Sequence, residues 1–241
     1  MSTVFQISDC HLSDESSFHN LEKALMSVQA DKNCHTILLT GDICCNPTSG
    51  DYKKLLRIVC SYIPNKQVFA IAGNHDDLAL MKRELKGSLI QVVDKAHIAG
   101  RDIIFLDSSH KPIDKRHPLG SGRIDNRGLS HLKKQLRKMT RPIVVIHHPV
   151  IRVGSEWMKA ICLENDREIF NILKRSGVKE IICGHGHDSI TTTAQGVTQY
   201  MSLATAYGFD HSIAEYNRTD RIGINKLIFS KQTVTVNEVV L

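Results

Sequence analysis

The feature that most constrains this 241-residue chain is a series of short apolar segments, several of which end in aspartate, asparagine or histidine. Segments of this kind are typical of buried strands, and they cover residues 4–7, 36–39, 68–71, 103–106, 143–146 and 180–183. Helical patterns separate several of them, over residues 18–29, 51–63, 78–85, 126–139 and 166–175. Strands that alternate with helices predict an α/β fold.

The polar residues after these strands form a candidate site. They comprise Asp9, His11, Asp42, Asn74, His75, His147, His185 and His187. In open α/β sheets the carboxyl ends of the strands share one rim, where ligands bind, so we expect these side chains to converge. Carboxylate and amide oxygens together with imidazoles suit Mn, Fe, Zn or Co, whereas a soft site would use thiolates. The pattern predicts a hydrolase with two metal ions.

The carboxyl-terminal part differs from the rest, because residues 190–200 and 225–240 show β-type alternation with little helical periodicity. We predict a second, more antiparallel β layer there. Residues 110–122 and 150–164 are rich in proline, glycine and charge, and we expect irregular loops. No glycine-serine or proline-rich linker divides the chain, and its 41% hydrophobic composition can supply one large core, so we expect a single domain over residues 1–241.

Composition and charge restrict the partners and the location. The amino terminus lacks the pattern of a signal peptide and no apolar stretch could span a membrane, so we expect a cytoplasmic protein without membrane contact. Seven cysteines without a Cys-x-x-Cys pair fit a reducing compartment. A net charge of +6 with only 5% aromatic residues argues against nucleic acid as a partner. The sequence leaves homo-oligomer formation open.

Five motifs resemble those of the calcineurin-like metallophosphoesterase superfamily. They stand here as Asp9-Cys10-His11, Gly41-Asp42, Gly73-Asn74-His75-Asp76, His147 and Gly184-His185-Gly186-His187. The resemblance implies a four-layer α/β/β/α sandwich, in which helices flank two mixed sheets. It also implies two divalent metal ions, with Fe or Mn favoured over Zn or Co. The first ion would be held by Asp9, His11, Asp42 and His187, and the second by Asp42, Asn74, His147 and His185.

The same resemblance implies catalytic roles. A hydroxide that bridges the two metals would attack the phosphorus, and His75 would protonate the leaving oxygen or stabilise the phosphoryl charge. Asp76 is the candidate that orients His75. Substrate contacts are expected from Asn74, His75, His148, Tyr207 and Phe209. The alternative for His148 is a supporting role behind the ligands, and for the two aromatic residues it is packing of a turn onto the core.

The substrate follows from a narrower similarity. Within the superfamily, residues 7–12, 73–77, 106–109 and 122–124 are most similar to class III cyclic nucleotide phosphodiesterases, which implies hydrolysis of 3′,5′-cyclic AMP to 5′-AMP. A nucleotide pyrophosphatase of the ADP-ribose type and a broad-specificity metallophosphatase remain alternatives, because the loops around such a centre decide access. A non-catalytic scaffold is disfavoured, because every metal ligand and His75 are present.

Overall fold

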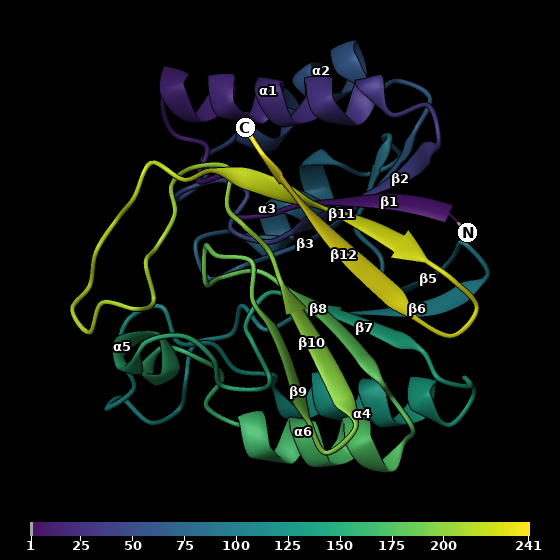
Figure 1. Ribbon diagram of the computed structural model, residues 1–241, viewed down its shortest axis with the longest axis vertical. Helices are drawn as coiled ribbons and strands as arrows, with labels where there is room; N and C mark the ends of the chain where they lie inside the picture. The colour runs from purple at the N-terminus through teal and green to yellow at the C-terminus, as the bar shows by residue number, and fades with distance from the viewer. Residues whose placement is uncertain (1) are drawn as a thin grey trace.

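Two six-stranded β-sheets lie face to face in the computed structural model, which describes residues 2–241 (Figure 1). The first has the order β12-β11-β1-β2-β3-β4 and the second β5-β6-β7-β8-β10-β9. The strands of the first sheet are β1 (Ser2–Ile7), β2 (Cys34–Thr40), β3 (Gln67–Ile71), β4 (Ile90–Gln91), β11 (Gly223–Phe229) and β12 (Val234–Val240). Those of the second are β5 (Lys95–Ile98), β6 (Arg101–Leu106), β7 (Ile143–Ile146), β8 (Glu180–Cys183), β9 (Thr191–Ala194) and β10 (Val197–Met201).

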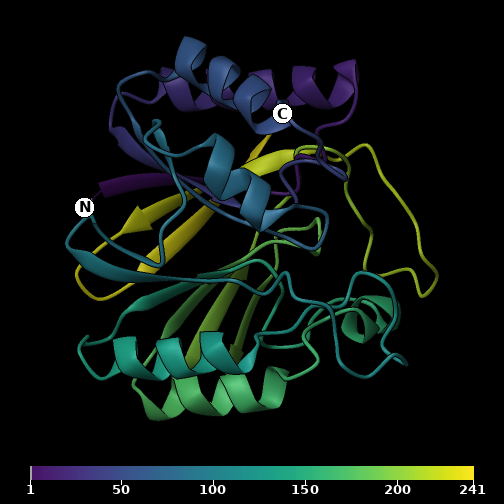
Figure 2. The same cartoon turned by 180° about the vertical axis from the view of Figure 1, so that it is seen from behind.

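Helices cover the outer face of each sheet, as Figure 1 and Figure 2 show from opposite sides. Those on the first sheet are α1 (Glu15–Ala30), α2 (Asp51–Tyr62) and α3 (Leu78–Glu84). Those on the second are α4 (Asn126–Leu136) and α6 (Asp166–Arg175). The short helix α5 (Glu156–Ala160) lies apart from both sheets, among loops. Both sheets contain parallel and antiparallel pairs, so the predicted four-layer sandwich of two mixed sheets is confirmed.

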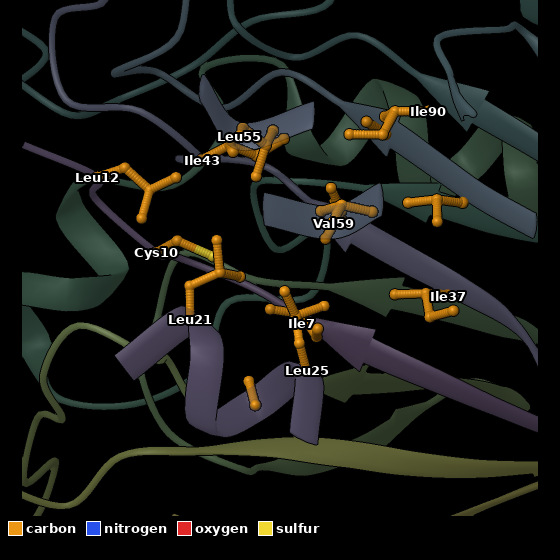
Figure 3. Packing of buried hydrophobic residues seen from close by; sticks show 14 of the residues in the cluster. Ile7, Cys10, Leu12, Leu21, Leu25, Ile37, Ile43, Leu55, Val59 and Ile90 are labelled. Carbon is orange, nitrogen blue, oxygen red and sulfur yellow. The ribbon is translucent and has the colours of Figure 1, made fainter. Parts of the chain in front are cut away.

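Three apolar clusters hold the four layers together. The outer cluster of the first sheet joins strand residues such as Ile7 and Ile37 to Leu21 and Leu25 of α1 and Val59 of α2 (Figure 3). A second cluster fills the space between the two sheets, and a third joins the second sheet to α4 and α6. Full burial of a leucine or isoleucine side chain is worth about 1.5–3 kcal/mol, so these clusters fix the strands whose ends carry the candidate site.

Three of the helices, α1, α3 and α4, begin where an aspartate side chain caps them. Asp14 accepts a hydrogen bond from the backbone N–H of Ser17, at 2.8 Å, and α1 therefore begins at Glu15, three residues before the predicted start. Asp77 and Asp125 cap α3 and α4 in the same way. No helix within residues 2–241 is long and apolar enough to cross a membrane.

The prediction for the carboxyl-terminal part was wrong in its arrangement. Its strands do not form one layer, because β9 and β10 join the second sheet whereas β11 and β12 join the first. β10 also pairs in parallel with β8, and β11 pairs antiparallel with β1. Alternation along a strand predicts its two faces but carries no information about its neighbours. The expected loop over residues 150–164 also contains α5.

Candidate metal centre

The carboxyl ends of five parallel strands deliver the predicted metal ligands to one place. Asp9 and His11 follow β1, Asp42 follows β2, Asn74 follows β3, His147 follows β7, and His185 and His187 follow β8. The Nε2 atom of His147 lies 3.4 Å from Oδ2 of Asp42, and Nε2 of His187 lies 3.3 Å from Oδ1 of Asp9. Residues up to 178 positions apart in the sequence therefore share one buried site.

Five of these residues adopt left-handed backbone angles. The φ values are +52° at Asp9, +44° at His11, +48° at Asp42, +71° at His185 and +51° at His187. This region is unfavourable for residues other than glycine, and its use clusters at functional sites where surrounding contacts hold it in place. Here the loops brace one another, since the N–H of Asp9 bonds the carbonyl of Gly41 at 3.0 Å and that of His11 bonds the carbonyl of Asp42 at 2.9 Å.

Two motif glycines allow the carboxylates to approach the backbone. A Cβ atom at Gly73 would collide with the carboxylate of Asp42, and one at Gly184 would collide with Ser8 and with the carboxylate of Asp9. No side chain therefore fits at these two positions. This explains why the Gly-Asn-His and Gly-His-x-His motifs both begin with glycine.

Three imidazoles are oriented by backbone carbonyls. The bonds join Nδ1 of His147 to the oxygen of Thr40 at 2.8 Å, Nδ1 of His187 to that of Tyr207 at 2.8 Å, and Nε2 of His185 to that of Ile161 at 2.9 Å. A carbonyl oxygen only accepts, so each bonded nitrogen carries the hydrogen. In the neutral ring the opposite nitrogen then keeps its lone pair, as a metal ligand must.

Two buried polar atoms without hydrogen-bond partners within residues 2–241 indicate whether cations fit this site. Among the described residues, neither Nε2 of His147 nor Oδ1 of Asn74 has a hydrogen-bond partner, although both are buried. Leaving a buried lone pair unsatisfied costs free energy, and coordination of a cation would remove that cost. Both atoms belong to the ligand set predicted for the second metal. The donor set therefore fits divalent ions.

The same side chains, together with His148, form three overlapping donor groups. Candidate ligand atoms lie within 4.8 Å of one another in the trios Asp9-His11-His187, Asp9-Asp42-His147 and His147-His148-His185. Oδ2 of Asp42 lies 3.8 Å from Nε2 of His11 and 3.4 Å from Nε2 of His147. Asp42 thus stands between the histidines of the two predicted metal sites, as a bridging carboxylate would.

The electrostatics of the site depend on burial and on the two carboxylates. Burial opposes a charge on His147, but Asp42 and Asp9 outweigh it and raise the pKa of His147 to about 9. Burial likewise opposes the charge of Asp42, yet His147 and His11 hold the pKa of Asp42 well below its usual value. For His185, burial dominates and lowers the pKa to about 3. The carboxylates are ionised at neutral pH, and cations compete with a proton at His147.

Asp76 is placed differently from the prediction. Its carboxylate accepts hydrogen bonds from the backbone N–H groups of Ile43, Cys44 and Gly73, at 2.9–3.0 Å, and from the hydroxyl of Tyr52 at 2.9 Å. It has no hydrogen bond to His75. Asp76 therefore joins the loop after β2 to the loop after β3, and does not orient the neighbouring imidazole directly.

His75 lies at the edge of the donor set and is half-buried. Its backbone N–H donates to Oδ1 of Asp42 at 2.8 Å, and its ring centroid is 4.9 Å from that of His11. The side-chain neighbour of its Nδ1 atom is Sγ of Cys45, at 3.8 Å. The imidazole is therefore accessible while its backbone is fixed to the metal centre.

His148 is fully buried, and protein groups occupy both of its ring nitrogens. Nδ1 lies 2.8 Å from the hydroxyl of Ser108, and Nε2 lies 3.0 Å from the carbonyl oxygen of Gly120. No ring nitrogen is left for a substrate. This geometry favours the supporting role over the predicted substrate contact.

The two predicted aromatic contacts also differ from each other. Tyr207 is half-buried, with its ring centroid 4.5 Å from that of His187 and 5.5 Å from that of His11. Phe209 is only 9% exposed and lies 4.5 Å from the His187 ring and 4.9 Å from the Trp157 ring. The position of Phe209 favours packing, whereas Tyr207 borders the metal centre.

Sequence reasoning missed Trp157 and Arg218, which complete this border. Trp157 packs on Phe209, and the guanidinium carbon of Arg218 lies 3.9 Å from the Tyr207 ring centroid. Neither residue stands at a strand end or in a motif. Nothing in the sequence alone marks them as neighbours of the centre.

Comparisons with known proteins agree with this geometry. The family model described as calcineurin-like phosphoesterase matches residues 2–189, a range that contains all five motifs. A probable cyclic nucleotide phosphodiesterase of Psychrobacter arcticus is 29% identical over 237 residues, which cover 86% of this chain and 81% of that protein. A 3′,5′-cyclic adenosine monophosphate phosphodiesterase of Vibrio vulnificus is 28% identical over 222 residues, which cover 86% of this chain and 77% of that protein.

A solved structure supports the fold independently. A dimetal phosphatase of Danio rerio superposes with a TM-score of 0.71 and 14% sequence identity, covering 98% of this chain and 95% of that chain. At this low identity the similarity shows the fold alone. It agrees with the four-layer sandwich described above.

Proposed function

We propose, because the chain belongs to the calcineurin-like phosphoesterase family, that it hydrolyses phosphodiester bonds and converts 3′,5′-cyclic AMP to 5′-AMP. The family confirms the resemblance predicted from the motifs and implies divalent metal ions. The observation that carries the proposal is the convergent donor set, in which the buried Nε2 of His147 and Oδ1 of Asn74 have no hydrogen-bond partner among the described residues. The names of the relatives from Psychrobacter and Vibrio support the substrate.

The residues that would hold the ions are those predicted from the motifs. Asp9, His11, Asp42 and His187 would hold one, and Asp42, Asn74, His147 and His185 the other. Bound divalent ions would acidify water and neutralise the charge of the phosphoryl group. The mixture of imidazoles and oxygen donors suits Fe, Mn, Zn and Co, and we propose Fe or Mn on the strength of the family resemblance.

The chain's own groups would orient the substrate and move a proton. Asn74 supplies a neutral amide, which limits the negative charge facing an anionic substrate. His75, half-exposed beside His11, would donate a proton to the leaving oxygen through its imidazole. Its backbone bond to Asp42 keeps that imidazole next to the site of bond cleavage.

We also propose a cytoplasmic location and small-molecule substrates. All seven cysteines are free, at Cys10, Cys34, Cys44, Cys45, Cys60, Cys162 and Cys183. Unpaired cysteines in this number fit a reducing compartment.

A panel of substrates tests the proposal. Protein loaded with Mn²⁺ would be assayed against cyclic AMP, cyclic GMP, 2′,3′-cyclic AMP, ADP-ribose and p-nitrophenyl phosphate, with Asp42→Ala protein purified in parallel as the control for contaminating activity. A kcat/KM that is highest for 3′,5′-cyclic AMP supports the proposal. A preference for ADP-ribose, or activity that persists in the Asp42→Ala protein, contradicts it.

A further inference from the structure

Arg218 occupies the long connection between β10 and β11, residues 202–222. In Figure 1 this connection projects from one side of the sandwich toward α5. The guanidinium carbon of Arg218 lies 3.9 Å from the Tyr207 ring centroid, and its Nε–H donates to the hydroxyl of Tyr216 at 2.8 Å. The guanidinium plane is therefore held between two tyrosines on the surface of this loop.

Arg218 lacks an acidic partner. Within residues 2–241 no carboxylate oxygen lies within 4.0 Å of its guanidinium, and its two Nη atoms make no hydrogen bond. Arg221, three residues further on, differs because it pairs with both Asp188 and Glu238. An exposed guanidinium with four unused N–H donors is available to bind a ligand.

The position of Arg218 relative to the metal centre is set by Tyr207. The Tyr207 ring lies beside His187 and His11, so Arg218 stands one aromatic layer outside the donor set. Its charge also acts on Cys45. Burial raises the pKa of this thiol, and the positive charge of Arg218 partly opposes that shift. Sγ of Cys45 in turn lies 3.8 Å from Nδ1 of His75.

The surroundings of Arg218 suit a planar ligand. Tyr216 is 58% exposed, and its ring is held edge-on by Phe209 at 5.4 Å and by Trp157 at 5.2 Å. The guanidinium covers a face of Tyr207, so a base cannot stack on that face. Nucleobases stack on tyrosine rings and on guanidinium planes, and guanidinium N–H groups also bond acceptor atoms at base edges.

We infer that Arg218 and Tyr216 form the surface that binds the nucleobase of the substrate, one aromatic layer outside the metal centre. The inference rests on the proposed function in that it takes a nucleotide as the substrate. It replaces Tyr207 and Phe209 as the base-contacting pair. The alternative ligand for Arg218 is a second phosphate group of the substrate. Binding a phosphate would require only a positive charge, whereas this site combines a charge with two tyrosines.

Two p-nitrophenyl esters isolate the contribution of the nucleoside. Thymidine 5′-p-nitrophenyl phosphate and methyl p-nitrophenyl phosphate share the leaving group and the single negative charge, and differ in the nucleoside. In Arg218→Gln, we expect kcat/KM for the thymidine ester to fall about tenfold more than that for the methyl ester. Arg218→Lys should show the same differential, because lysine keeps the charge but lacks the plane. Tyr216→Ala should show it too.

A matched control removes a positive charge elsewhere. Lys231 lies exposed in the turn between β11 and β12, at the opposite end of β11 from the loop. Lys231→Gln should affect both esters equally. An equal loss on both esters in Arg218→Gln, or full activity on the thymidine ester in Arg218→Lys, would overturn the inference in favour of a charge effect.

A binding measurement separates this inference from the proposed function. Calorimetry with the Mn²⁺-loaded protein would compare 5′-AMP with inorganic phosphate. We expect 5′-AMP to bind more tightly in the wild type, and Arg218→Gln to lose most of that advantage. If Arg218→Gln still binds 5′-AMP more tightly than phosphate by the wild-type factor, the base site is overturned. If Arg218→Gln loses this preference but the wild type hydrolyses no diester, the base site stands and the proposed function is overturned.

Discussion

The donor set at the strand ends and the loop beside it, residues 202–222, are held in different ways. The donors are fixed by backbone contacts between short loops, such as the 3.0 Å bond from Asp9 N–H to the Gly41 carbonyl. The loop is joined to the donors by a few backbone bonds, such as that from the Ala206 N–H to the Asp9 carbonyl at 3.2 Å. Its outer side chains are held by packing, with Phe209 against Trp157 and Arg218 over Tyr207. Changes in the loop can therefore alter what binds while the metal chemistry is preserved.

Removing the bridging candidate should have the largest effect. In Asp42→Ala, both predicted metal sites lose a ligand, so we expect loss of both ions and a fall in kcat of more than about 10⁴-fold. Metal analysis after gel filtration and steady-state assays measure the two outcomes. The control is Asp102→Ala, which removes a carboxylate that contacts only His97 at the surface. Retention of both ions by the Asp42 variant would show that Asp42 does not bridge.

His75→Ala should separate proton transfer from metal binding. The imidazole lies beside the donor set without belonging to the ligands predicted for either ion, so the ions should remain bound while kcat falls by about 10²–10⁴-fold. Substrates with a good leaving group, such as p-nitrophenolate, should lose less than cyclic AMP, because such a group needs no proton. A loss that is equal for both kinds of substrate would contradict a role as proton donor.

Sequence reasoning correctly predicted that the polar side chains at the ends of the strands converge. Asp9 and Asp42 could be placed together because the parallel strands β1 and β2 deliver their carboxyl ends to one edge of the first sheet. His147 reaches them from β7 of the second sheet, which the rule for a single sheet does not predict. Asp76 was assigned to its neighbour His75, but the N–H groups of the loop after β2 hold its carboxylate instead. Such a contact between loops leaves no periodicity in the sequence.

The loop over residues 202–222 also makes contacts that the sequence pattern does not reveal, between residues further apart in the chain. Arg218 and Trp157 are 61 positions apart in the sequence, and both pack on the turn that carries Tyr207 and Phe209. The contacts depend on where the connection crosses from the second sheet to the first, and the strand pattern could not reveal that crossing. Their role becomes visible only once the two sheets are assembled.

Gly184→Ala tests the packing that holds the donors. The added methyl would collide with Ser8 and Asp9, and overpacking of this kind costs about 1–3 kcal/mol of unfolding free energy. Metal affinity should fall as well, because Asp9 must move. Gly177→Ala is the contrast: its methyl meets open space at a φ of +79°, so it should lower stability by about 1 kcal/mol without loss of metal. Denaturant unfolding and metal titration would distinguish the two.

Phe209→Ala should test whether the loop is held by packing, with the smallest effect on the chemistry. Phe209 is 9% exposed and contacts the His187 and Trp157 rings, so truncation should lower the unfolding free energy by about 2–4 kcal/mol. The metals should stay bound, because Nδ1 of His187 is held by the Tyr207 carbonyl and not by the Phe209 ring. Activity on the thymidine and methyl esters should fall by the same factor, in contrast to Arg218→Gln. A loss confined to the thymidine ester would show that Phe209 contacts the base. It would then favour Tyr207 and Phe209, and not Arg218 and Tyr216, as the surface that binds the base.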